Sequence, residues 1–328
     1  MQKARHSIQE TGLVLLYLGL GVASALLWYR IITYRLQFVP YLQLPPGLSV
    51  PQLENWHREM IAGQADAPNQ YRALTPWIVQ YLVLPLNLWA TIYDAYAVVR
   101  ALFTGLALLA FDRYLRQWFA RGAAAAGALC LAAVIPFTYY AVFQESDPLN
   151  LLVLVLAFIC LGRGRDVWLF PLVLIGTLNR ETTLMIPAMY VLTRWREERT
   201  GKVLLRGALL TLGWAAVFGG LHALYGARPA YAEAIMWGKN LRSATPTLYA
   251  LVLFGVLWAL PWAAPKEAPA LLRRGRWLVL PFLLLHYVVA EVREVRLFLP
   301  LTPIVIPLSW WVLFPEAVLK PTPERGRR

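Results

Sequence analysis

Three short stretches of this sequence place charged side chains where they can do chemistry, and the first is QESDP, residues 144–148. Here Glu145 and Asp147 flank a single serine. Two carboxylates at this spacing can hold a metal ion or orient a polar acceptor. The same residues also suit the start of a helix, where they would cap its N-terminus and complement its dipole. Both interpretations stay open. If the chain uses a divalent cation, Mg²⁺ or Mn²⁺, we expect it on Glu145 and Asp147.

The second stretch is LNRETT, residues 178–183, which separates two apolar segments that are each too short to cross a bilayer. We therefore expect Asn179, Arg180 and Glu181 below the membrane surface, in a re-entrant turn. Ionisable side chains at that depth are costly, and they usually serve a binding site or pair with one another. The sequence favours a substrate-binding role. The alternative is an internal Arg180–Glu181 pair, with Thr182 capping the next helix.

The third stretch is EVREVRLFLPLTPIVIP, residues 291–307, which opens with Glu291, Arg293, Glu294 and Arg296. On a helix, Arg293 and Arg296 would share one face and could grip a phosphate together. Arginines that snorkel at the interface, with local ion pairs to the two glutamates, would give the same pattern.

A fourth group lies nearer the N-terminus, where LENWHREMIAG is typical of a short helix. Glu54 and His57 would share one face of that helix, and a carboxylate beside a histidine can act as a general base. Arg72 follows in the segment YRALTP. A solvated amphipathic helix explains the same spacing, so this assignment also stays open.

The composition shows what kind of molecule must position these groups. Of the 328 residues, 59% are hydrophobic and only 15% are charged. A soluble protein carries about 45–50% apolar and about 25% charged residues. The apolar surplus recurs as long runs along the whole chain, which excludes a soluble globular enzyme and a disordered chain. The sequence is that of a multi-pass integral membrane protein.

The hydrophobic runs number about ten, and a full span needs about 20 residues. The first is read as a retained signal-anchor helix, because it is too long for a signal-peptide core and lacks a small-residue cleavage site. Three others are short and must be shielded by protein or line a water-filled cavity. The runs fall near residues 12–34, 88–111, 122–143, 149–162, 167–178, 183–193, 203–225, 247–264, 277–290 and 297–314.

The charges orient these runs. The net charge is +13, and most of the 31 basic residues fall in alternate loops that the positive-inside rule assigns to the cytoplasm. We therefore read the charge as a topology signal, with no nucleic-acid partner. The predicted fold is all-α: one polytopic transmembrane helix bundle, residues 1–328, in the inner (plasma) membrane, with both termini cytoplasmic. A large extracytoplasmic first loop, residues 36–87, carries amphipathic helices.

The sequence contains no common motif for zinc binding or for redox chemistry. The 2 cysteines, Cys130 and Cys160, lie in apolar runs, and the 4 histidines are scattered without the spacing of a zinc site. We expect no cofactor beyond the divalent cation considered above.

Taken together, this arrangement resembles the GT-C superfamily of integral membrane glycosyltransferases. The similarity lies in the large outer loop after the first span, the segment YRALTP and the late RLFLPLTP. The NRET and E-x-R-x-x-x-P stretches look like those of small bacterial members. The E-x-D pair departs from the pattern, because it falls in the second outer loop, whereas many members carry an acidic motif in the first.

The resemblance implies a specific reaction. Such enzymes transfer a sugar, with inversion, from a polyprenyl-phosphate carrier to an extracytoplasmic glycan, lipid or protein acceptor. By this resemblance Glu54 is the first-loop acid, and Glu145 and Asp147 match the acidic motif. Arg180, Arg293 and Arg296 are the candidates for the lipid phosphate. We place His57, Arg72, Asn179, Glu181 and Glu291 among the substrate-binding residues.

Two other classes fit the same charges. In a lipid or solute transporter or scramblase, buried ionisable residues line the translocation path. Against this class, the two halves of the sequence show no inverted repeat and no matching pair of glycine-broken helices. The third class is a non-catalytic membrane scaffold.

Overall fold

A computed structural model describes residues 2–38, 51–139, 145–230, 235–242, 244–292 and 294–319, and within these ranges the fold is helical, with no strand. The first seven α-helices are α1 (Gln2–Phe38), α2 (Pro51–Ala62), α3 (Leu74–Ile78), α4 (Ile92–Leu115), α5 (Arg121–Val134), α6 (Ser146–Gly162) and α7 (Leu169–Asn179). The others are α8 (Met185–Arg194), α9 (Thr200–Tyr225), α10 (Trp237–Arg242), α11 (Ala244–Phe254), α12 (Ala270–Gly275), α13 (Val279–Val289) and α14 (Thr302–Leu313). The predicted all-α class is confirmed for this part of the chain.

Among the described residues, 5 helical segments are long and apolar enough to cross a membrane. They are Gln9–Ile31, Ile92–Leu115, Arg121–Thr138, Thr200–Tyr225 and Val295–Leu313. The chain therefore has the helices of a membrane protein. The last of these segments is the most enclosed, with 89% of its most apolar window buried, so it forms the centre of the bundle.

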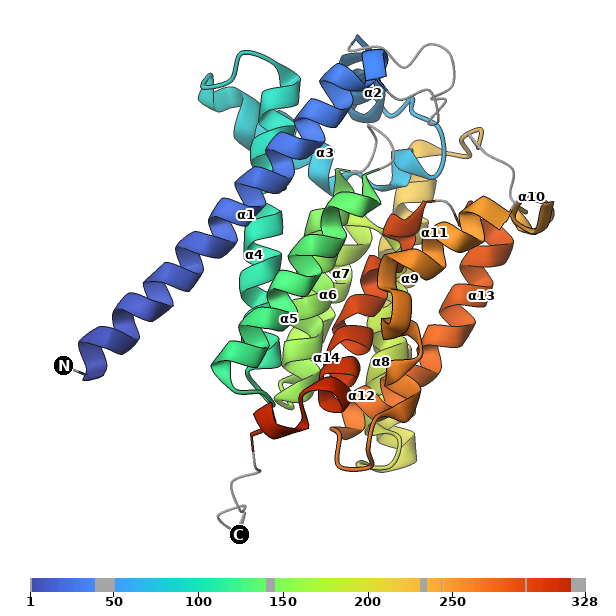
Figure 1. Ribbon diagram of the computed structural model, residues 1–328. Coiled ribbons are helices and arrows are strands. Elements are labelled where there is room, and N and C mark those ends of the chain that lie inside the picture. The colour runs from blue at the N-terminus through green and yellow to red at the C-terminus, as the bar shows by residue number, and fades with distance from the viewer. Residues whose placement is uncertain are drawn as a thin grey trace.

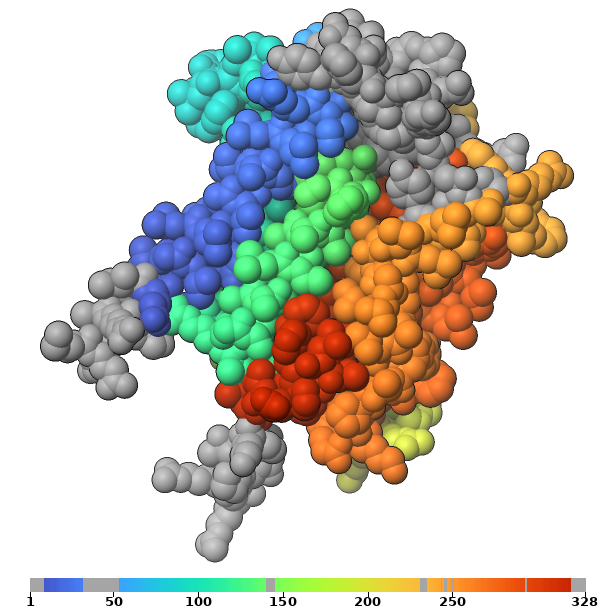
Figure 2. Space-filling view, viewed as in Figure 1, coloured from blue at the N-terminus to red at the C-terminus, as the bar shows by residue number. Residues whose placement is uncertain are grey.

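Two long helices pack through small residues. Gly21 of α1 lies against the Ala101 carbonyl and Gly105 of α4, so a Cβ at Gly21 would collide with the backbone of α4. This close approach places α1 along the bundle, with Leu15, Leu26 and other apolar side chains of its outer face exposed. Figure 2 shows this face standing clear of the other helices. In a bilayer, lipid would cover it.

Three of the shorter helices coincide with the runs that the sequence marks as too short to span. α6 has 17 residues, α7 has 11 and α8 has 10. α7 packs between α6 and α9, and α8 packs on α9 and α12. The long helix α9 thus packs against both α7 and α8, and protein covers one side of these short helices.

Residues 51–87, the described remainder of the predicted first loop beyond α1, form a helical layer at one end of the bundle (Figure 1). α1 continues to Phe38, three residues into the expected loop, and α2 confirms the short helix predicted around residue 54. α3 follows, with the helical turns Val79–Val83 and Leu84–Leu86. α3 packs on α2, α6 and α7, so the layer closes over the ends of the short helices.

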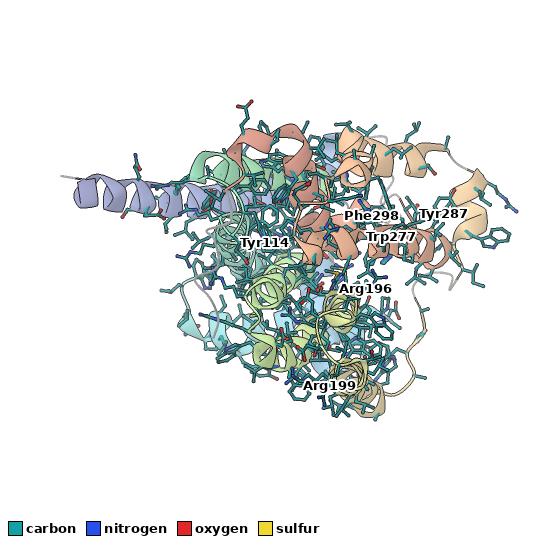
Figure 3. All side chains as sticks on the ribbon, turned by 90° about the horizontal axis from the view of Figure 1, so that it is seen from below. Tyr114, Arg196, Arg199, Trp277, Tyr287 and Phe298 are labelled. Atoms are coloured by element: carbon teal, nitrogen blue, oxygen red, sulfur yellow. The ribbon has the colours of Figure 1, made fainter. Side chains whose placement is uncertain are left out.

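The opposite end of the bundle carries exposed arginines. The connections from α6 to α7 and from α8 to α9 lie there, with Arg163, Arg165, Arg196 and Arg199 exposed on them. Figure 3 looks along the bundle from this side and labels Arg196 and Arg199 on the second connection. We call this end of the bundle the basic end. We call the end covered by α2 and α3 the cavity end, because a cavity lined by Arg72 and Arg296 opens there.

Candidate functional site

The site at the cavity end is built on the break after α7. The helix ends at Asn179, and Arg180 has extended backbone, with φ −164° and ψ 137°, before a 3₁₀ turn, Glu181–Leu184. Asn179 holds the break in place. Its Oδ1 accepts a hydrogen bond from Thr75 Oγ1 of α3 at 2.8 Å, and its Nδ2 donates to the Ser146 carbonyl of α6 at 2.8 Å. The LNRETT stretch is therefore a junction of three helices, in which Asn179 and Arg180 are buried.

Asp147 shares its carboxylate between two buried guanidinium groups. Arg180 Nη1 pairs with Oδ1, and Arg296 Nη1 lies 3.6 Å from Oδ2. The Arg180 and Arg296 side chains are only 2% and 4% exposed. Arg296 also donates from Nε and Nη2 to Glu294 Oε2, at 3.1 and 2.7 Å. Buried charges are tolerated when they are paired in this way.

Glu181 pairs with an arginine from the helical layer. Arg72 donates from Nε to Glu181 Oε2 at 3.0 Å, and its Nη2 bonds Oε1, giving a two-pronged contact. The Trp214 indole of α9 donates to the Glu181 carbonyl at 3.0 Å. The sequence-based alternative, an internal Arg180–Glu181 pair, is wrong. The extended backbone at Arg180 separates the two side chains, and each finds a partner from another segment.

These pairs set the protonation of the glutamates. Burial alone would raise the pKa of Glu181, but the Arg72 guanidinium and then Arg180 outweigh it and lower this pKa to about 2. Burial likewise acts on Glu294, and Arg296 outweighs it, so the pKa of Glu294 lies below its usual value. Both carboxylates are ionised at neutral pH.

A cavity of about 350 Å³ opens beside these pairs. One wall carries the charged groups of the two ion pairs, and the other is formed mainly by α13 and the chain before α10. The lining residues are Ala67, Pro68, Arg72, Glu181, Thr182, Ala230, Met236, His286, Val289, Ala290, Glu291, Glu294, Arg296 and Leu297. Glu291, at the end of α13, accepts a hydrogen bond from Lys239 of α10 at 2.9 Å.

The structure brings most of the predicted substrate-binding residues to this place. Arg72, Glu181, Glu291 and Arg296 line the cavity. Asp147, Asn179 and Arg180 form the buried support just described. Arg293 lies outside the described residues. Sequence reasoning did not select two lining residues, Glu294 and His286. What distinguishes Glu294 from the neighbouring residues is its ion pair with Arg296. Nothing in the sequence marks His286, a histidine in an apolar helix, as a lining residue.

Two predicted residues of the first loop lie away from the cavity. Glu54 is exposed on α2, whereas His57 is buried and only 3% exposed. His57 Nδ1 and the Tyr96 hydroxyl are 2.8 Å apart, and Nε2 lies 2.9 Å from Gln80 Oε1. Because an amide oxygen only accepts, Nε2 donates to it and Nδ1 accepts from Tyr96. Burial lowers the pKa of His57, so the ring is neutral, and its hydrogen bond with Tyr96 links α2 to α4.

The QESDP carboxylates do not converge. Glu145 is buried, 4% exposed, and acts electrostatically on Tyr93 and Tyr96 of α4, whereas Asp147 pairs with Arg180 and Arg296. The described residues contain no group of three or more His, Cys, Asp or Glu side chains placed to hold a metal ion. A carboxylate that already faces two guanidinium groups, as Asp147 does, is a poor ligand for a metal ion.

Comparison with known proteins adds nothing to this geometry. No family model, curated protein or solved structure matches the chain.

Proposed function

We propose that this protein is a membrane glycosyltransferase of the GT-C type, which moves a sugar from a polyprenyl-phosphate carrier to an extracytoplasmic acceptor. The observation that carries the proposal is the cavity in which Arg72 and Arg296 lie among carboxylates, next to the apolar, exposed face of α13. A lipid-phosphate sugar needs all three features: cations for the phosphate, a base for the acceptor and an apolar path for the tail.

The proposed orientation has ten membrane segments and both termini in the cytoplasm. Support comes from the distribution of basic side chains, because exposed arginines gather on the connections at the basic end, away from the cavity. Under the positive-inside rule the basic end faces the cytoplasm and the cavity faces outward. The membrane is proposed to be the cell inner membrane.

The arginines would bind and stabilise the phosphate. Each guanidinium carries five N–H donors, and the contact with Glu181 takes two of those of Arg72. Arg72 therefore keeps donors for a phosphate in the cavity, and Arg296, which also lines the cavity, adds positive charge. Their carboxylate partners hold them in place beforehand, so little reorganisation is needed as negative charge grows on the leaving phosphate.

The lipid tail would leave the cavity over α13. Val289 and Ala290 line the cavity, and Leu284, Leu285 and Val288 continue along the helix with 58%, 56% and 44% of their surfaces exposed. A polyprenyl chain on this face would remain in contact with membrane lipid while its phosphate reached the arginines.

The acceptor's proton would go to Glu291. In the transfer, the acceptor oxygen bonds to the anomeric carbon, the bond from that carbon to the phosphate oxygen breaks, and a carboxylate takes the acceptor proton. Glu181 and Glu294 have lowered pKa values and are weak bases. Asp147 supports Arg296 from outside this cavity. Glu291 lines the cavity, and its partner, Lys239, is 55% exposed.

Binding of undecaprenyl phosphate tests the phosphate site. The purified protein in nanodiscs is titrated with this lipid, alongside the charge-balanced variants Arg72→Gln/Glu181→Gln and Glu294→Gln/Arg296→Gln. Each double variant should weaken binding by about tenfold or more, because charge-assisted hydrogen bonds to the phosphate are lost. Arg58→Gln, which removes an exposed arginine of α2 at the same end, should bind like the wild type. Wild-type affinity in both double variants, with folding intact, refutes the site.

Turnover separates the base from the binding groups. With a polyprenyl-phosphate sugar that supports transfer, Glu291→Gln should bind the donor normally and lose about a hundredfold or more in rate. Glu54→Gln, Glu145→Gln and Asp147→Asn are measured beside it, because the sequence alone favours these carboxylates. Full turnover in Glu291→Gln moves the base to whichever of the three variants is inactive.

A further inference from the structure

A second, larger cavity lies at the basic end. Its volume is about 670 Å³, and it opens among the α6–α7 connection, α8 and the first half of α9. The lining residues are Gly164, Arg165, Asp166, Val167, Phe170, Tyr190, Glu198, Arg206, Leu209 and Leu210. None of them belongs to the site proposed above.

The two carboxylates of this cavity are neutralised by their own partners. Asp166 accepts from Arg194 Nε and Nη2 at 3.0 and 2.8 Å, and Glu198 pairs with Lys202 at 2.8 Å. Arg206 lies 3.6 Å from Glu198, and Arg165 is exposed, with no ion pair to any part of the chain that the structure describes. The lining therefore carries excess positive charge, on Arg165 and Arg206, which is suited to an anion.

A buried hydroxyl adds a donor to the same lining. Tyr190 is 1% exposed, and its hydroxyl makes no hydrogen bond of standard geometry within the described ranges, although it interacts with the Arg206 side chain. A buried polar group without a satisfied hydrogen bond is costly, so this hydroxyl marks a place where a ligand oxygen would be stabilised.

The rest of the lining is mostly apolar, and three of its side chains are exposed. Val167, Phe170 and Leu209 have 79%, 45% and 51% of their surfaces exposed. Exposed apolar side chains of this size are better suited to contact with lipid than to contact with water. Only 22% of the most apolar window of α9 is buried, so lipid would surround this helix. A cavity with cations at the helix ends and apolar side chains along the helix flanks matches an amphiphile whose charged head lies at the membrane surface.

We propose that this cavity binds an anionic phospholipid of the leaflet at the basic end. Its phosphate would lie between Arg165 and Arg206, with a hydrogen bond from the Tyr190 hydroxyl. One acyl chain would run over Phe170 and Leu209. The site needs no sugar transfer and stands whether or not the outer cavity is catalytic.

Lipid binding to the full-length protein tests the proposal. The detergent-purified chain is titrated with dioleoyl phosphatidylglycerol or dioleoyl phosphatidylcholine, and bound lipid is counted by native mass spectrometry. Phosphatidylglycerol should bind about tenfold more tightly than phosphatidylcholine, and Arg165→Gln/Arg206→Gln should remove that difference. Arg196→Gln/Arg199→Gln takes the same charge from exposed positions outside the cavity and should retain it.

Two further arms decide what the site recognises. Inorganic phosphate and glycerol phosphate, at about a hundredfold excess, should fail to displace the lipid, because the apolar lining contributes to its affinity. Displacement by either would make the site one for a free anion and overturn the lipid assignment. Equal loss of selectivity in the two double variants would show a diffuse surface charge, and unchanged selectivity in Arg165→Gln/Arg206→Gln would place the lipid elsewhere. Tyr190→Phe should weaken binding about threefold to tenfold without changing folding.

Discussion

The two ends of the bundle use the same side chain for opposite purposes. At the cavity end Arg72, Arg180 and Arg296 are buried, and each contacts a carboxylate from another segment or a neighbouring turn. At the basic end Arg196 and Arg199 are exposed. A buried charge costs several kcal/mol unless it is paired, whereas an exposed one costs little. Arginines at the cavity end therefore fix the relative position of four chain segments, whereas Arg196 and Arg199 place their charges at the surface.

The largest predicted effect is that of Asp147→Ala. Removing this carboxylate leaves Arg180 and Arg296 facing each other with their shared partner gone. We expect the free energy of unfolding to fall by about 3–5 kcal/mol, because the buried Arg180 loses its ion-pair partner, whereas Arg296 keeps Glu294. Urea titration of the detergent-purified variant, followed by tryptophan fluorescence, measures this loss.

The matched control is Asp147→Asn, which keeps the shape and the hydrogen-bond acceptor and should be destabilised less than the alanine variant. A loss below about 1 kcal/mol in Asp147→Ala would put the carboxylate among ordinary surface groups and contradict a structural role for the buried arginines.

A smaller effect is predicted for one arginine of the basic end that breaks its pattern. Arg194 is only 13% exposed and bonds Asp166, Glu197 and the Leu161 carbonyl. Arg194→Gln should cost about 2 kcal/mol, the value of a few charge-assisted hydrogen bonds. Arg196→Gln, two residues further along the same connection, should stay within about 0.5 kcal/mol of the wild type. Equal losses in these two variants would mean that burial does not separate the two kinds of arginine.

The Arg72–Glu181 pair predicts a pH dependence. The pKa of Glu181 is about 2 in the folded protein and about 4.3 in an unfolded chain. A lowered folded-state pKa gives stability that is fully present above the unfolded value and is lost as the pH falls toward the folded value. Wild-type stability should therefore decline below about pH 4.5, and the decline should be shallower in Glu181→Gln. Unfolding measured at several pH values between neutral and acid checks this. Parallel curves for the two proteins would contradict the pair.

Much of the fold follows from the sequence alone. Within the described residues, each apolar run predicted from hydropathy falls largely in helical structure, because a run of this composition has few other ways to satisfy its backbone in lipid. The break at Asn179–Arg180 was also predictable, since the apolar runs on either side of these polar residues are each too short to span a membrane. Helix α2 followed from its local pattern.

The pairing of charges could not be predicted in the same way. Asp147, Arg180 and Arg296 come from three distant segments, and only the packing of those segments decides which carboxylate meets which guanidinium. His57 shows the same limit. Its spacing from Glu54 fits a catalytic pair on one helix face, but α4 covers the histidine with Tyr96 and leaves the glutamate exposed. Periodicity predicts a face, and tertiary contacts decide its use.

The smallest predicted effect concerns a pair at the cavity end that joins an exposed lysine to a half-buried glutamate. Lys239 is 55% exposed, and its contact with Glu291 spans 2.9 Å. A double-mutant cycle with Lys239→Gln and Glu291→Gln should give a coupling free energy of about 0.2–1 kcal/mol, which added salt should reduce. Because this pair lies at the same end as Asp147, a small coupling shows that burial, and not position along the bundle, separates the structural ion pairs from the others. A coupling above about 2 kcal/mol that resists salt would place Lys239 and Glu291 among the buried pairs, and it would count against Glu291 as an available base.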